Sequence, residues 1–255
     1  MNILVLLKQT FDTEERIIIE NGKVSEKEAK YIINPYDEFA VEEAVKIKES
    51  TGADVTIVTV GPPRVESAVR AALAMGADKA IIVEEDSFEG DEFTISKVLA
   101  AVVKRDSYDL ILGGYMAVDD GAAQVGPRLA EELDIPHIAT ITKLEIENGT
   151  VKVEKDIEGD TEIIETTLPV LLTAQQGLNE PRYPTLPGIM KAKKKPIERL
   201  TIEELGLNLD AIQSKTEVID QYPPQKKTEG KILKGEIPDQ VQELVKYLRS
   251  EAKVV

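Results

Sequence analysis

The chain has 255 residues, of which 42% are hydrophobic and 31% charged, and its formal net charge is −16. This length supports a sizeable core, and the acidic balance argues against a nucleic-acid partner because phosphates repel such a surface. With no cysteine, the sequence excludes disulfides, thiolate metal sites and cysteine nucleophiles. The N-terminal residues lack a signal-peptide pattern and no apolar run approaches the roughly 20 residues of a membrane span, so we expect a cytoplasmic protein without membrane insertion.

The first two-thirds of the chain alternate strand-like and helix-like segments. Residues 2–8 form a continuous apolar run, as expected for a strand buried on both faces, and a helix is predicted over 38–50. Further strands are predicted at 54–60, 79–83 and 109–112, and further helices at 63–75 and 93–105. This alternation indicates right-handed βαβ units and a parallel sheet. Because ligands bind at the carboxyl ends of such strands, the loops after Lys8, Val60 and Gly113 form the candidate site.

The pattern changes after the fourth strand. Strands are predicted at 143–147, 151–156, 162–166 and 168–173. Asn148-Gly149 lies between the first two and is a strong hairpin signal. Beyond residue 178 the periodicity gives way to a proline-rich, basic stretch, and a last helix is predicted over 239–252. We therefore predict one compact domain over residues 1–178 and an extended arm over 179–255, whose terminal helix packs on something other than its own core.

The segment Asn34-Pro35-Tyr36-Asp37 opens the first predicted helix. Asn34 suits an N-cap, Pro35 suits the first helical position, and Asp37 is spaced to close a capping box. A well-capped helix is one interpretation. The second adds a function, because this helix start faces the carboxyl end of the sheet, where its side chains would border a nucleotide.

Small residues dominate the loop at 113–126, between a strand and a helix. They let the backbone approach a ligand closely, and exposed N–H groups at a helix start attract anions. Asp119 and Asp120 would repel phosphate, so we expect them to cap a turn or to bind ribose hydroxyls. Pro127 leaves two helix starts open: near Asp120 with a kink, or later with the N–H groups of the loop free. An ordinary strand-to-helix turn is the structural alternative.

A basic run at 191–195 reverses the local charge of an acidic chain. Such a run is usually a solvated surface. Here it follows a segment stiffened by three prolines, in which Leu186 stands among polar residues. That arrangement suits docking on an acidic partner surface.

No pattern typical of catalysis is present. His137 is the only histidine, and its neighbours suggest neither a triad nor a metal site, so a structural role is expected. GxGxxG and P-loop patterns are both missing from the sequence. We therefore predict no catalytic residue, no metal site and no enzyme activity of the chain alone.

Four segments together resemble the electron-transfer flavoprotein β-subunit family. They are residues 34–44, 71–78, 117–120 with Gln124, and 178–195, of which the last holds the most specific motif. The resemblance covers nearly the whole chain. It implies an α/β fold with a parallel-sheet, adenine-nucleotide-hydrolase-like (Rossmann-like) domain, an added β-hairpin and an extended C-terminal arm. It also implies a heterodimer with an α subunit that holds most of the FAD.

A structural AMP in this chain is a further implication of the resemblance. The matching cofactor-binding positions are Leu6, Asn34, Pro35, Tyr36, Asp37, Val60, Gly114, Ala117, Val118, Asp119, Asp120, Gly121, Ala122, Ala123, Gln124 and Val125. The matching partner-docking positions are Arg182, Tyr183, Leu186, Pro187, Ile189, Met190, Lys191 and Lys194, with Leu186 as the anchor. Where the family can place an aromatic residue over the flavin, this chain has Thr13, so we assign it no flavin contact.

The function that the resemblance implies is electron transport. The heterodimer would accept electrons from flavin dehydrogenases, such as the acyl-CoA dehydrogenases of fatty acid β-oxidation, and pass them to a quinone-linked oxidoreductase. One alternative is a bifurcating flavoprotein of the same family, with a second FAD in place of AMP and NADH as donor; such members tend to carry an Asp-Gly-Asp-Thr type of sequence, which differs from residues 117–122 here. Another is a stand-alone ATP-binding stress-type module, which leaves the lysine-rich arm unexplained.

Overall fold

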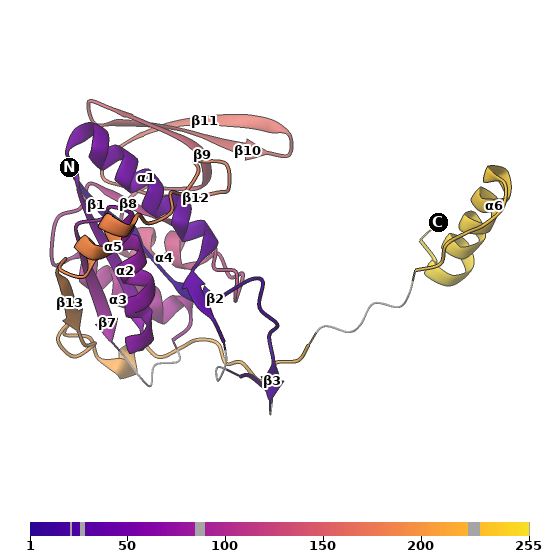
Figure 1. The fold of residues 1–255 in the computed structure, drawn as a ribbon, viewed down its shortest axis with the longest axis horizontal. Helices are drawn as coiled ribbons and strands as arrows, with labels where there is room; N and C mark the ends of the chain where they lie inside the picture. Colours follow the sequence, from indigo (N-terminus) through magenta and orange to yellow (C-terminus); the bar gives the residue numbers. More distant parts are fainter. Residues whose placement is uncertain (21, 26–28, 85–89, 224–229, 255) are drawn as a thin grey trace.

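The computed structural model describes residues 1–20, 22–25, 29–84, 90–223 and 230–254. A nine-stranded sheet forms its centre, with the strand order β11-β10-β9-β12-β8-β1-β6-β7-β13. Helices cover both faces of this sheet (Figure 1). The α/β class predicted from the sequence is confirmed.

Parallel strands make up most of the sheet. They are β9 (His137–Glu147), β12 (Val170–Ala174), β8 (Leu110–Gly114), β1 (Asn2–Leu6), β6 (Asp54–Gly61), β7 (Lys79–Glu84) and β13 (Ile197–Leu200). At one edge, β9 continues as the antiparallel neighbour of β10 (Thr150–Ile157), which pairs with β11 (Asp160–Thr167). Two small antiparallel pairs join β2 (Gln9–Phe11) to β5 (Tyr31–Ile33) and β3 (Ile19–Glu20) to β4 (Lys23–Val24). The predicted hairpin turn lies between β9 and β10, with Asn148 and Gly149 both at positive φ.

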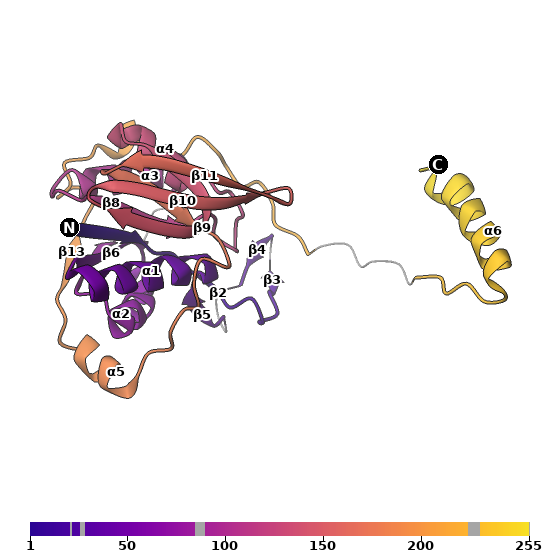
Figure 2. The ribbon, with the colours of Figure 1, turned by 90° about the horizontal axis from the view of Figure 1, so that it is seen from above.

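Helices α1 (Pro35–Thr51) and α2 (Glu66–Met75) cover one face of the sheet, and α3 (Glu92–Val103) and α4 (Val125–Leu133) cover the other (Figure 2). Alternation along β1 explains the two layers. Ile3 and Val5 pack into the core cluster of α1 and α2, whereas Leu4 packs into that of α3 and α4. All three side chains are 0% exposed, which accounts for the unbroken apolar run in the sequence.

The packed body extends past residue 178, where the sequence places the end of the compact domain. Helix α5 (Leu186–Ala192) lies beside α2, and β13 then adds the ninth strand by pairing with β7. Ile202 and Ile212 are buried in the α3 and α4 cluster. The sequence conceals this extension because β13 has only four residues, of which Glu198 and Arg199 are exposed.

The last helix, α6 (Ile237–Tyr247), stands apart from the sheet (Figures 1 and 2). It is followed by a π-helical turn at Leu248–Ala252. Its apolar side chains Ile237, Val241, Leu244 and Val245 are all exposed. Within the described ranges, no helix combines the length and the apolar composition that a bilayer crossing requires.

Candidate functional site

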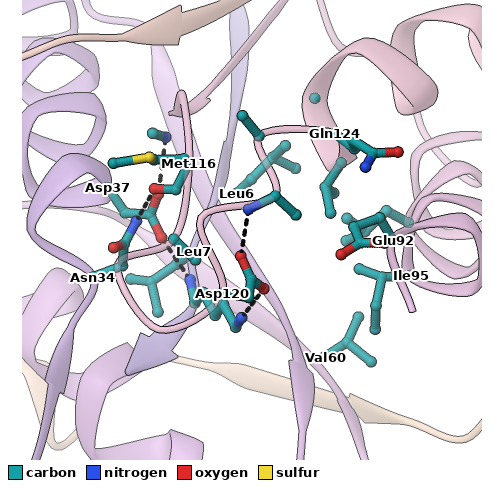
Figure 3. A pocket seen from close by; sticks show the side chains of 18 of the residues that line it. Leu6, Leu7, Asn34, Asp37, Val60, Glu92, Ile95, Met116, Asp120 and Gln124 are labelled. Carbon is teal, nitrogen blue, oxygen red and sulfur yellow. Dashed lines mark hydrogen bonds and ion pairs between the residues drawn. The ribbon is translucent and has the colours of Figure 1, made fainter. Parts of the chain in front are cut away.

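A cavity of about 210 Å³ opens at the carboxyl ends of β1, β6 and β8. Apolar side chains, among them Leu6, Val60 and Ile95, form its wall. Figure 3 shows Asn34, Asp37 and Met116 gathered on one side of the cavity and Glu92, Ile95 and Gln124 on the other. The site therefore lies where the parallel sheet places ligands, between the starts of α1, α3 and α4.

Asp37 joins the ends of two neighbouring strands. One carboxylate oxygen accepts the N–H of Lys8 after β1 at 2.7 Å, and the other accepts the N–H of Gly114 at the end of β8 at 2.8 Å. A Cβ atom on Gly114 would lie 2.4 Å from Asp37 Oδ1, so only glycine fits there. Burial, opposed by the two N–H donors, raises the pKa of Asp37 to about 6. Asp37 thus fixes the rim of the cavity and does not close the predicted capping box.

Asn34 fixes the loop after β8 rather than capping α1. Its side-chain amide donates to Met116 O at 2.9 Å, and its Oδ1 accepts the N–H of Val118 at 3.2 Å. No side-chain cap bond is formed at Asn34, where α1 begins. Both polar residues at this helix start therefore hold strand-end loops in place, which favours the functional interpretation of the segment.

Lys8 forms a bridge to the two acidic residues of the loop. Its ammonium lies 2.8 Å from Asp119 Oδ1 and 2.7 Å from Asp120 Oδ2. Burial disfavours the charge of Lys8, but the two carboxylates outweigh it and raise the pKa of the ammonium. Asp120 Oδ1 also accepts the N–H of Ala122 at 2.9 Å, a local turn of the kind expected for these aspartates. Lys8 was not predicted as a site residue from the sequence, although it lies two residues after the end of β1, on the expected rim.

The loop before α4 is strained and exposes its amides. Gly121 and Ala123 adopt φ values of 65° and 55°, and a non-glycine residue in this region costs roughly 1 kcal/mol or more. Helix α4 begins only at Val125, the later of the two predicted starts. Among the residues that the structure describes, the N–H groups of 123–126 have no hydrogen-bond acceptor. Such a concave run of free N–H groups is suited to binding an anion.

Asp91 connects the cavity to the arm that follows the sheet. It caps α3 by accepting the N–H of Thr94 at 3.1 Å, and its second oxygen accepts the N–H groups of Lys215 at 2.6 Å and Thr216 at 3.0 Å. Burial opposes ionisation of Asp91, but these hydrogen bonds outweigh it and lower the pKa to about 2. Residues 215–216 are thereby held next to the mouth of the cavity.

Most sequence-predicted cofactor positions meet in this cavity. Its lining includes Leu6, Asn34, Asp37, Val60, Gly114, Ala117, Asp120, Ala122, Ala123, Gln124 and Val125. It also includes residues that the sequence analysis missed, namely Lys8, Asp91, Glu92 and Ile95. Asp119 and Gly121 belong to the loop but not to the lining. Pro35, Tyr36 and Val118 line a second hollow of about 710 Å³, together with Thr13 and Tyr183.

The arm is attached firmly to α1 at its base. The Arg182 guanidinium reaches both oxygens of Glu42, at 2.8 and 2.9 Å, and pairs with Glu49 at 2.5 Å. Hydrogen bonds to Glu49 and Glu42 raise the pKa of Arg182. Asn179 adds a bond to Glu43 at 2.9 Å. The sequence assigns Arg182 to docking, and the structure places its side chain against α1, where it holds the arm in place.

Beyond this base the arm presents an apolar surface. Leu186, Ile189 and Met190 on α5 are 74%, 43% and 60% exposed. Pro187 lies in the first turn of α5, and Lys191 and Lys194 are exposed beside the apolar residues. Tyr183 is 93% exposed. We call Leu186, Ile189 and Met190 the docking face.

Replacing Lys8 by glutamine is expected to loosen the loop more than the fold. The two ion pairs are partly exposed, so their loss should cost about 1 kcal/mol of unfolding free energy or less. The amides of 119–124 should exchange with deuterium several times faster, because Asp119 and Asp120 lose their shared cation. Hydrogen exchange resolved by peptide checks this, and Lys143→Gln, which breaks two partly exposed ion pairs with Glu145 and Glu154, is the control. Unchanged exchange at 119–124 would contradict the role of Lys8.

Comparison with known proteins agrees with this geometry. A family model described as "Electron transfer flavoprotein domain" matches residues 21–205. The chain is 55% identical to "Electron transfer flavoprotein subunit beta" of Bacillus subtilis (strain 168), with 100% of both chains covered. It is 38% identical to the Homo sapiens protein of the same name, over 90% of this chain and 91% of the relative. It is also 37% identical to "Caffeyl-CoA reductase-Etf complex subunit CarD" of Acetobacterium woodii, over 94% and 95%. The chain therefore belongs to the electron transfer flavoprotein β-subunit family.

Proposed function

We propose that this chain pairs with an α subunit and that the pair carries electrons from flavin dehydrogenases, such as acyl-CoA dehydrogenases, to a quinone-linked acceptor. The observation that carries the proposal is the combination, in one chain of this family, of a cavity at the strand ends and a separate, exposed docking face. Within this pair, the chain has no catalytic residue of its own. It holds a nucleotide, binds the α subunit and positions the donor.

The lining of the cavity supports AMP as its occupant. Leu6, Val60 and Ile95 offer an apolar wall for a flat purine, and polar side chains such as Asn34 and Gln124 offer partners for ribose hydroxyls. The free N–H groups of the loop before α4 suit a single phosphate. In the described lining, four carboxylates (Asp37, Asp91, Glu92 and Asp120) face one cation, Lys8. This excess of negative charge disfavours each further phosphate group.

FAD would be held mainly by the α subunit, and when bound it would supply the electron-carrying chemistry. The contribution of this chain to the heterodimer is a surface. Helix α6 exposes Val241, Leu244 and Val245 along one side, and an amphipathic helix with an uncovered apolar side is suited to packing on another chain. We propose that α6 packs on the α subunit.

Partner dehydrogenases would bind at the docking face. A cluster of exposed apolar side chains on a held helix has the form of an interface hot spot, with Leu186 as its most exposed member. Lys191 and Lys194 beside it favour a partner whose apolar pocket has an acidic rim. Tyr183 and Pro187 extend the same surface.

The second candidate function is a bifurcating flavoprotein. It is favoured by the relative named as a subunit of a caffeyl-CoA reductase-Etf complex, which is 37% identical over 94% of this chain. In that case the cavity would hold part of a second FAD, with NADH as donor. The acidic lining described above is the observation against it, because FAD brings two phosphates.

Analysis of released nucleotides separates these candidates. We expect the purified heterodimer, after denaturation, to release one AMP and one FAD per pair of chains. Two FAD and no AMP would establish the bifurcating alternative instead. A colourless chain that is stable without a companion and binds ATP would favour the stand-alone module. The measurement is chromatography of the supernatant, calibrated against protein concentration, with the α subunit expressed alone as the control.

A further inference from the structure

Helix α5, which carries the docking face, lies directly against α2. A Cβ atom on Gly188 would lie 2.6 Å from the carbonyl oxygen of Ala74, so the two backbones meet where α5 has no side chain. At its end, Ala192 is 2% exposed. Figures 1 and 2 show α5 on the outer side of α2, away from the sheet. Any side chain at position 188 would therefore prevent this close contact between α5 and α2.

The carboxyl end of each of the two helices is bound by a cationic side chain from the other segment. The Arg70 guanidinium, on α2, donates to the carbonyl oxygens of Ala192 at 2.8 Å and Lys195 at 3.0 Å, at the end of α5 and just beyond it. In return, the Lys195 ammonium donates to the carbonyl oxygens of Leu73 at 2.9 Å and of Ala77, at the end of α2. Terminal helix carbonyls lack intrahelical partners and carry the negative end of the helix dipole, so both cations are well placed.

These contacts divide the lysine run into two groups. Lys191, Lys193 and Lys194 are exposed and point to solvent or to a partner. Lys195 is half-buried, and burial, together with the nearby charge of Lys48, lowers its pKa. Its ammonium donates two hydrogen bonds to carbonyl oxygens at and just beyond the end of α2. Charge alone in the sequence does not distinguish Lys195 from its neighbours.

A seven-residue helix has little stability of its own. Within α5 the one side-chain cap is Thr185, whose hydroxyl accepts the N–H of Gly188 at 3.2 Å. Without the contacts to α2, the helix would fray, and Leu186, Ile189 and Met190 would have to be ordered when the partner binds. Ordering such side chains weakens an interface even when every contact in the complex is retained.

We propose that Arg70 and Lys195 are positioning residues, which hold α5 on α2 so that the docking face is formed before the partner arrives. This inference rests on the proposed docking function and deepens it, because neither residue belongs to the docking face itself. Their effect is on the KM for the donor, since they order the surface that meets it. The electron-transfer step within the complex does not depend on them.

The test replaces Arg70 by methionine, which keeps the length of the side chain and removes the donors. In the purified heterodimer, amides of 188–192 should exchange about tenfold faster, and the KM for an acyl-CoA dehydrogenase donor should rise about tenfold at unchanged kcat. FAD content should not change. Lys195→Met should give the same pattern, because it removes the reciprocal contact. Arg70→Lys should show a smaller increase in exchange and in KM than Arg70→Met, because an ammonium can still reach one carbonyl.

The matched control is Arg105→Met, which removes an arginine that pairs with Glu198 at 2.7 Å on the α3 side of the sheet. It should leave the KM and the exchange of 188–192 unchanged. A second control uses the Leu186→Ala background, in which Arg70→Met should add less than its full tenfold factor, since both changes act on the same surface.

Each outcome bears on the inference. Faster exchange with a raised KM supports it. Unchanged exchange in Arg70→Met overturns the positioning role. So does faster exchange with an unchanged KM. In either case the docking function stays intact if Leu186→Ala raises the KM. If Leu186→Ala itself leaves the KM unchanged, the docking function fails and the positioning role fails with it, and the exchange rates then report only whether the contacts stabilise α5.

Discussion

Between pH 4 and pH 7, the unfolding free energy of the native chain is expected to fall by about 2.5 kcal/mol relative to that of the Asp37→Asn variant. Burial raises the pKa of Asp37 from 3.8 to about 6. A carboxyl whose pKa is higher in the folded state favours folding fully below the unfolded pKa of 3.8, and this contribution is lost as the pH rises through 6. Asparagine carries no such titration, so the two stability curves should converge or cross.

The same variant should lose the geometry of the cavity rim. Only a carboxylate has an acceptor for each of the two N–H groups, of Lys8 at 2.7 Å and Gly114 at 2.8 Å. In asparagine one of them would face an NH₂ group, which leaves a buried donor without a partner. We therefore expect retention of AMP to fall at pH 7.

Denaturant unfolding of the heterodimer across pH, at fixed protein concentration, measures the first effect, and nucleotide content after gel filtration measures the second. Asp54→Asn makes the same chemical change at the exposed start of β6 and controls for the loss of one carboxylate. Parallel stability curves for Asp37→Asn and the native chain would show that Asp37 does not titrate in this range. Full retention of AMP in the variant would show that the two N–H bonds do not shape the cavity.

The cavity and the acidic loop illustrate what local sequence patterns predict well. Buried strands such as β1 and β6 follow from continuous apolar runs, and the order of strands and helices places their carboxyl ends together. The hairpin between β9 and β10 follows from Asn148-Gly149, because that turn requires φ > 0 at both positions. Each of these features depends on neighbours in the sequence, and the edge of the sheet at which the cavity opens follows from them.

The contacts that shape the cavity depend on distant residues and were not predictable in the same way. Asn34 and Asp37 have the spacing of caps, and the sequence cannot show that their side chains bind the end of β8 and the loop after it instead. Lys8 was missed because a lone lysine after a strand carries no motif. Only the fold brings Asp119 and Asp120 within 3 Å of it.

The arm differs from expectation for a related reason. Glu42 and Glu43 occupy the buried side of α1, where periodicity predicts apolar residues. They are tolerated there because Arg182 and Asn179, about 140 positions away in the chain, satisfy them. Likewise Lys195 resembles its lysine neighbours in the sequence but serves the end of α2. A surface predicted from charge alone therefore includes residues that the fold uses to hold that surface in place.

Leu186→Ala is expected to weaken electron transfer from the donor dehydrogenase by raising its KM about 30-fold, which corresponds to about 2 kcal/mol of binding. Leu186 is the most exposed member of the docking face, at 74%, on a helix held to α2 by the contacts of Arg70 and Lys195. An apolar side chain exposed on an ordered helix carries little ordering cost on binding, so its burial in a partner pocket contributes nearly in full. Truncation removes that burial and leaves the helix in place. Stopped-flow reduction of the heterodimer by an acyl-CoA dehydrogenase at increasing donor concentration measures the effect.

The control distinguishes a loss of docking from the effect of truncating any exposed leucine. Leu209→Ala makes the same truncation at a leucine that is 53% exposed in the 3-10 helix Leu209–Ala211, which is not part of α5 or of the docking face. FAD and AMP contents of both variants should equal those of the native heterodimer, because neither residue lines the cavity. A raised KM in both variants would mean that the effect is not specific to α5, and a native KM in Leu186→Ala would remove the docking face from the proposed function. A raised KM in Leu186→Ala alone, at an unchanged limiting rate, is the result expected of an anchor: it determines how tightly the donor is held, while the distance between the flavins is set elsewhere in the heterodimer.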